Sequence, residues 1–190
     1  MFDRITNDVL CDKVIIDDQL AAYEAVGFLI DKGFKKIALI TTVDYVSVGK
    51  LRTEGYVNVL NDHDIPVNNG MIIKIEDIDD CASKIEKLLR EEKPDAIFAV
   101  NELFAVTTIK LANKMGLKVP EDISVIGFTD GIISQFSTPS ITTVSQNGIK
   151  MGGRAAKMLI ERLEMDEEDE QYKTEVIETH LVERESTLSL

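Results

Sequence analysis

The chain has 190 residues, of which 44% are hydrophobic and 29% are charged, and these values are ordinary for a globular protein. Its formal net charge is -13, and no Lys/Arg cluster is large enough to form the basic face that binds DNA phosphates, so we expect no DNA binding by this chain alone. No apolar run reaches the roughly 20 residues of a membrane span, and no secretory signal is visible. Cys11 and Cys81 are far apart without metal-type spacing, which favours reduced thiols in the cytoplasm.

Short apolar segments alternate along the chain with amphipathic helical segments. Strand patterns occupy residues 14–17, 36–41, 71–75, 96–100, 124–128, 141–144 and 176–182. Helical patterns occupy residues 19–32, 48–61, 82–89, 102–115 and 148–164. Strands separated by single helices indicate a parallel sheet with right-handed crossovers. The five strands between residues 36 and 144 therefore predict an α/β fold with a doubly wound parallel sheet.

The tract GLKVPEDISVIGF at residues 116–128 predicts a helix end, a loop and a buried strand. Gly116 can adopt the positive φ of a helix C-cap, and Pro120 prevents the helix from resuming. The apolar run 124–128 is typical of a strand that is covered on both faces. Small and polar residues follow at the carboxyl end of this strand, where ligands bind in open α/β sheets.

Polar side chains follow three of the predicted strands. Arg52 lies in the first turns of the helix after one strand, Asn101 directly follows the next, and Thr129 and Asp130 follow a third. A guanidinium group can bind paired hydroxyls or a carboxylate with two parallel hydrogen bonds. Because parallel strands end at one edge of the sheet, this convergence predicts a site for a polyhydroxylated small molecule.

Each of these residues also has a purely structural interpretation. On position alone, a place on the surface explains Arg52, and capping of the helix that follows explains Asn101. The pair Asp17-Asp18 could be read as a metal or acid pair. A strand end followed by a helix N-cap explains it better, because a carboxylate accepts hydrogen bonds from the free N–H groups there.

Signatures of enzymes are largely missing from the sequence. There is no G-x-G-x-x-G, G-x-x-x-x-G-K-[ST] or G-x-S-x-G motif, and His63 and His180 have no Cys or Ser partner nearby in sequence. The titratable candidates at the predicted edge are Glu102 and Asp130, again without a histidine partner. We therefore expect a binding protein rather than an enzyme, with no cofactor and no metal site.

Motifs spread over nearly the whole chain, in order and with correct spacing, resemble those of transcription factors of the lac-repressor/galactose-repressor type. They are FDR at 2–4, GFKKIALI at 33–40, RTEGY at 52–56, AVNE at 99–102, the tract at 116–130, PSITTV at 139–144 and LVEREST at 181–187. Members of this family carry a helix-turn-helix, a hinge helix and a two-lobed effector domain that resembles periplasmic sugar-binding proteins. The resemblance thus implies a periplasmic-binding-protein-like fold.

The resemblance also implies a domain organisation. Residues 17–144 and 176–190 correspond to the complete second, Rossmann-like lobe, and residues 1–16 and 145–175 correspond to remnants of the first lobe. Neither the helix-turn-helix nor the hinge matches any part of this chain. Since FDR at the start reads as the end of a strand, we expect that the chain has been trimmed from a larger protein.

The resemblance assigns roles to individual residues. Arg52 and Asn101 match effector contacts of the family. Thr129 stands where the family usually has an aspartate, and a hydroxyl cannot accept hydrogen bonds from two sugar hydroxyls as a carboxylate does. We expect Asp130 to take over part of that role. Asp3 corresponds to an aspartate of the first lobe that faces the cleft.

These points predict the effector-binding and dimerisation domain of a bacterial regulator in the cytoplasm. Its effector would be a small molecule such as a sugar or phosphosugar, and DNA would be bound only through the missing headpiece. The homodimer would form through the helix Glu102–Met115 and the loop Gly131–Ser137, where Ile132, Ile133 and Phe136 form an apolar patch. The alternative is a periplasmic-type sugar-binding receptor of a transport system, which shares the two-lobed architecture.

Overall fold

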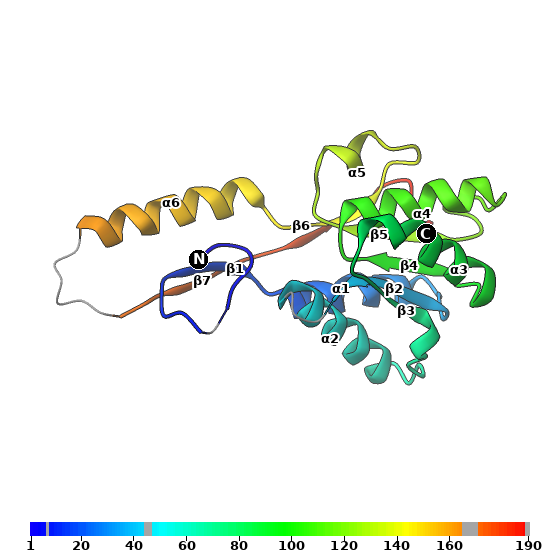
Figure 1. The fold of residues 1–190 in the computed structure, drawn as a ribbon, viewed down its shortest axis with the longest axis horizontal. Helices are drawn as coiled ribbons and strands as arrows, with labels where there is room; N and C mark the ends of the chain where they lie inside the picture. Colours follow the sequence, from blue (N-terminus) through cyan, green and yellow to red (C-terminus); the bar gives the residue numbers. More distant parts are fainter. Residues whose placement is uncertain (7, 44–46, 165–170, 189–190) are drawn as a thin grey trace.

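The computed structural model of the chain describes residues 1–6, 8–43, 47–164 and 171–188. A six-stranded sheet in the order β3-β2-β4-β5-β6-β8 forms its centre (Figure 1). The parallel strands are β2 (Ile37–Thr42), β3 (Ile72–Ile75), β4 (Ala96–Ala99), β5 (Ser124–Phe128) and β6 (Thr142–Ser145). The edge strand β8 (His180–Val182) runs antiparallel to β6. The predicted doubly wound parallel sheet is confirmed.

Helices cover both faces of this sheet. Helices α1 (Asp18–Asp31) and α2 (Ser47–Asp62) lie on one face, and α3 (Cys81–Glu91) and α4 (Glu102–Lys114) lie on the other (Figure 1). The 3₁₀ turns η1 (Asn69–Met71) and η2 (Ile78–Asp80) flank β3. Because both faces are covered, β4 and β5 are buried at every position, as their continuous apolar sequences predict. None of the described helices is long and apolar enough to span a membrane.

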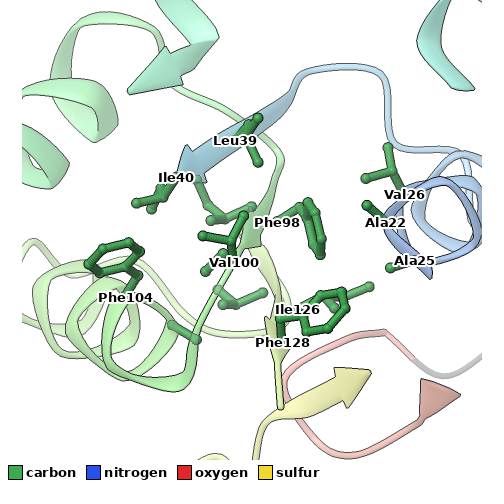
Figure 2. Packing of buried hydrophobic residues seen from close by; sticks show 14 of the residues in the cluster. Ala22, Ala25, Val26, Leu39, Ile40, Phe98, Val100, Phe104, Ile126 and Phe128 are labelled. Carbon is green, nitrogen blue, oxygen red and sulfur yellow. The ribbon is translucent and has the colours of Figure 1, made fainter. Parts of the chain in front are cut away.

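Two aromatic rings of the core lie beneath α1, on the central strands β4 and β5. Phe98 and Phe128 lie on neighbouring strands with ring centroids 6.3 Å apart and ring planes tilted by 60°, a favourable edge-on arrangement. Figure 2 shows these rings on the side of the sheet that faces Ala22 and Ala25 of α1, with Phe104 of α4 on the opposite side. Small side chains on α1 therefore let the helix lie close above two aromatic rings.

Two segments, β1 (Lys13–Ile16) and β7 (Thr174–Ile177), form a separate parallel sheet away from the central one (Figure 1). The prediction of a single strand over residues 176–182 was wrong, because the chain passes between the two sheets there. β7 pairs with β1, whereas β8 pairs with β6. At the bend, Nδ2 of Asn147 donates to the carbonyl oxygen of Glu178 at 2.7 Å. The lobe boundaries remain a prediction.

Helix α6 (Gly148–Glu164) packs against β1 on one side only. Met151 and Met158 are its buried residues, and the guanidinium of Arg162 binds both carboxylate oxygens of Asp12 at 2.8 and 2.9 Å. Four large apolar side chains of α6 are exposed: Ile149, Leu159, Ile160 and Leu163. Helix α6 thus carries an uncovered apolar face, which we call the α6 face.

Another difference concerns residues 131–137, which the sequence predicted to be a loop. The structure forms a short helix there, α5 (Ile132–Phe136), beside α4. Its first turn is held by the carboxylate of Glu102, as described below. A side-chain cap supplied from 29 or more positions away is not visible in the local sequence pattern.

We expect Gly55→Ala to destabilise the fold because α1 and α2 approach each other closely at this position. An added Cβ would overlap the backbone carbonyl of Gln19 and lie 2.9 Å from Cβ of Ala22. Overpacking of this kind costs about 1–3 kcal/mol of the free energy of unfolding, measured by urea denaturation. Gly153→Ala is the matched control, since a Cβ on this α6 glycine meets nothing within 4 Å. Equal losses in both variants would contradict close packing at Gly55.

Candidate ligand-binding site

The carboxyl edge of the central sheet is built around Arg52, which points inward from the second turn of α2. Its Nε and Nη2 atoms each lie 2.7 Å from Oδ1 of Asp18, the first residue of α1. Its Nη1 atom donates to the carbonyl oxygen of Val100 at 2.7 Å. Both charged residues are only 5% exposed. A surface position for Arg52 is therefore excluded, and the guanidinium joins the ends of α1, α2 and β4.

The flat face of the same guanidinium stacks on an aromatic ring. Cζ of Arg52 lies 3.4 Å from the centroid of the Phe128 ring at the end of β5. The electron-rich ring face attracts the cation, and this attraction is strongest where water is excluded. Within the described part of the chain, one N–H on each Nη atom of Arg52 has no partner. Two donors thus remain for another molecule.

Burial changes the pKa values of this ion pair in opposite directions. Desolvation raises the pKa of Asp18, and the positive charge and hydrogen bonds of Arg52 oppose that rise. Desolvation likewise lowers the pKa of Arg52, and Asp18 opposes that fall. Because arginine loses its proton only at very high pH, Arg52 stays charged, and its positive charge favours the ionised form of Asp18.

Asn101 caps α4, as its structural interpretation predicted. Its Oδ1 accepts a hydrogen bond from the backbone N–H of Phe104 at 2.9 Å. The next residue, Glu102, has a role that sequence reasoning missed. Its Oε1 accepts from the backbone N–H groups of Gly131 and Ser134 at 2.8 and 3.0 Å, and from the Ser134 hydroxyl at 2.7 Å. Glu102 therefore holds α5 against the start of α4.

Thr129 and Asp130 follow β5 but differ in their surroundings. Thr129 has a φ of 79°, which is strained for a β-branched residue, and its hydroxyl donates to Oε1 of Gln146 at 3.0 Å. Strained backbone of this kind occurs preferentially at ligand sites. Asp130 is already paired, because its Oδ1 accepts from Nη2 of Arg184 at 2.6 Å. Its carboxylate faces Arg184 rather than Arg52.

Asp3 lies beside the two-stranded sheet, where its backbone N–H donates to the carbonyl oxygen of Val14 at 3.1 Å. Its φ is 64°, and its negative charge influences both Arg52 and Asp18. The structure thus brings Asp3 into the electrostatic surroundings of Arg52. At the end of β2, the Thr42 hydroxyl is a buried polar atom without a hydrogen-bond partner among the described residues.

Of the residues predicted for the site, Arg52 contacts the strand ends that lead directly into Asn101 and Thr129. The carboxylate of Asp130 faces Arg184 instead. Asp18 was not predicted as a site residue, because the sequence analysis interpreted Asp17-Asp18 as a strand end and a helix cap. The pair does contain the N-cap of α1, but the cap is Asp17, whose Oδ1 accepts from the N–H of Leu20 at 2.9 Å. Asp18, in contrast, is the buried partner of Arg52.

The family model "Periplasmic binding protein-like domain" matches residues 26–187. The chain belongs to this family. Its relatives include the probable HTH-type transcriptional regulator EndR of Paenibacillus polymyxa, which is 34% identical over 99% of this chain and 57% of its own length. The resemblance to lac-repressor type regulators is therefore confirmed. The chain spans little more than half the length of this relative.

Solved structures of regulators share this fold. The transcriptional regulator CelR in complex with cellobiose superimposes with a TM-score of 0.84 at 28% identity, covering 93% of this chain and 54% of that one. A sugar-binding LacI-family regulator from Escherichia coli in complex with phosphate gives 0.80 at 28% identity, covering 93% of this chain and 63% of that one. These similarities are to regulators and do not support the alternative of a transport receptor.

We expect Asp18→Ala to lower the free energy of unfolding more than most substitutions do. The reason is that it leaves the Arg52 charge buried and unpaired. Breaking a buried ion pair in this way costs about 3–5 kcal/mol of the free energy of unfolding. The double variant Asp18→Leu with Arg52→Met removes both charges and recovers most of that loss, as urea denaturation would show.

The control for this prediction is Glu86→Ala, which breaks the exposed pair with Arg90 on α3 and leaves stability almost unchanged. A loss for Asp18→Ala no larger than the loss for Glu86→Ala would contradict the buried ion pair.

Proposed function

We propose that this chain is the effector-binding and dimerisation domain of a bacterial transcriptional regulator of the LacI family, and that its effector is a sugar or sugar derivative. The observation that carries the proposal is Arg52 at the carboxyl edge of the parallel sheet, with two N–H donors left over after Asp18 and Val100 are bound. Asn101 and Thr129 lie at the strand ends that Arg52 touches. The cellobiose held by CelR supports a sugar-type ligand.

The proposed effect of the ligand is on conformation, and no chemistry on the ligand is required. A ligand that binds better to one arrangement of the two lobes shifts the population toward that arrangement. In the whole regulator, a cytoplasmic protein in this proposal, that shift changes operator affinity through a separate DNA-binding headpiece, and the coupling acts equally in both directions. The acidic charge of this chain is consistent with leaving DNA contact to another part of the protein.

The ligand site is tested by thermal shift of the chain with neutral sugars, cellobiose and ribose among them. A sugar present at about 100 times its Kd stabilises the folded state by about 2.7 kcal/mol, which raises the Tm. We expect Arg52→Lys to abolish the rise because an ammonium group cannot replace the planar fork. Asn101→Ser keeps a capping oxygen but loses the amide, so it tests the ligand contact without removing the cap.

The control is Asn68→Ser, because Asn68 caps η1 at the amino end of β3, whereas the proposed site lies at the carboxyl ends of the strands. A rise that survives both Arg52→Lys and Asn101→Ser would contradict this site. The fold would be unaffected by that result.

We also propose that dimerisation uses α4 and α5. Leu103 on α4 and Ile132, Ile133 and Phe136 on α5 are 41–80% exposed. Beside them, a groove of about 390 Å³ runs between α3 and α4, lined mainly by apolar atoms. In a two-fold dimer the same patch on both copies is buried at once, which suits an apolar surface of this kind.

We expect Phe136→Ser to weaken the dimer, measured as a larger monomer fraction in sedimentation equilibrium, because it removes the aromatic ring of α5, which is 80% exposed. Leu10→Ser is the matched control, since the Leu10 side chain is 80% exposed, like that of Phe136, and lies outside α4, α5 and α6. If the association state were unchanged by Phe136→Ser, or changed equally by Leu10→Ser, the proposed dimer surface would be wrong.

A further inference from the structure

The charge of Arg52 is cancelled inside the protein before any ligand arrives. Asp18 Oδ1 receives hydrogen bonds from two nitrogens of the guanidinium at 2.7 Å, and both side chains are removed from water. At this distance and burial the two charges act on a third group almost as a dipole rather than as a free cation. The two N–H donors left on Arg52 therefore offer hydrogen bonds without a net positive charge.

The surroundings add negative rather than positive charge. Asp3 and Asp17 both act on Asp18 through their charges, and both raise its pKa. Among the described residues, Arg4 adds a further positive charge that acts on Arg52. Counting Arg4, Arg52 and the three aspartates together, the charges sum to -1, in a chain whose formal net charge is -13. An anion that approaches Arg52 must therefore enter a negative environment.

We propose that Asp18 determines the ligand charge that this site accepts, selecting neutral polyhydroxylated molecules and excluding phosphorylated or carboxylated ones. The inference rests on the proposed function, in which Arg52 faces the ligand. Hydroxyl oxygens of a neutral sugar accept the two remaining N–H donors at no electrostatic cost. A phosphate group would gain the attraction of Arg52 but meet the repulsion of Asp18 at nearly the same distance.

The phosphate complex of the sugar-binding regulator from Escherichia coli gives the contrast. That relative has the same fold and holds phosphate. The fold by itself thus does not prevent anion binding. In this chain, the proposal assigns the exclusion of anions to the carboxylate of Asp18. Because an arginine with its charge uncompensated is a strong and geometrically specific phosphate binder, removing that carboxylate is expected to create phosphate affinity.

The experiment uses Asp18→Asn, in which the amide oxygen still accepts the hydrogen bonds of Arg52 and only the charge is removed. Inorganic phosphate is titrated at constant ionic strength into the wild-type chain and into the variant, with binding measured by calorimetry. We expect the Kd for phosphate to fall by about tenfold or more in Asp18→Asn. The gain must disappear in the double variant Asp18→Asn with Arg52→Gln.

Asp17→Asn is the matched control. Asp17 is the exposed neighbour of Asp18, does not contact Arg52, and remains a good N-cap as asparagine. A general effect of lower negative charge would strengthen phosphate binding equally in Asp17→Asn and Asp18→Asn, and that result would overturn the proposal. An unchanged phosphate Kd in a folded Asp18→Asn chain would overturn it as well.

A second measurement needs no variant and covers the case in which Asp18→Asn does not fold. The wild-type chain is titrated with ribose and with ribose 5-phosphate, and we expect the neutral sugar to bind at least as tightly as the phosphorylated one. Tighter binding of the phosphorylated sugar would contradict the role of Asp18. The proposed site fails by a separate result, in which the rise in Tm caused by a neutral sugar survives both Arg52→Lys and Asn101→Ser.

Discussion

The buried ion pair between Arg52 and Asp18 is the interaction on which the carboxyl edge of this fold depends. It connects α1 to α2, reaches β4 through the carbonyl oxygen of Val100, and reaches β5 through the ring of Phe128. Four elements from separate parts of the chain therefore meet at one guanidinium group. Since an unpaired charge is very costly in such a place, any rearrangement of this edge must keep both partners together or admit water or a ligand.

A second polar connection leads from this edge toward the apolar surface of α5. Asn101 caps α4 and lies at the end of β4, and the adjacent Glu102 holds the first turn of α5 through three hydrogen bonds. Two residues that are adjacent in sequence thus connect the proposed ligand site, at the end of β4, with α5 and the proposed dimer surface. This arrangement gives a physical route by which occupancy of the proposed site and association of two copies can influence each other.

The sequence predicted the parts of this fold that are determined locally. Continuous apolar runs located the five parallel strands, and Gly116 has the expected positive φ of 81°. Features that depend on distant partners were not predictable in the same way: Asp18 and Arg52 are 34 positions apart, and Asp130 and Arg184 are 54 apart. The same holds for β7 and β8, which read as one strand because residues 176–182 show no break in β-type sequence although they pair in two different sheets.

The α6 face has a consequence for the behaviour of the chain in solution. An uncovered apolar helix at one end of a strongly acidic chain makes the molecule an amphiphile, in which like charges keep copies apart while the helix attracts them. Dissolved salt shortens the range of the repulsion, to about 10 Å at 0.1 M, and leaves the apolar attraction in place. We therefore expect association through the α6 face to increase as salt is added.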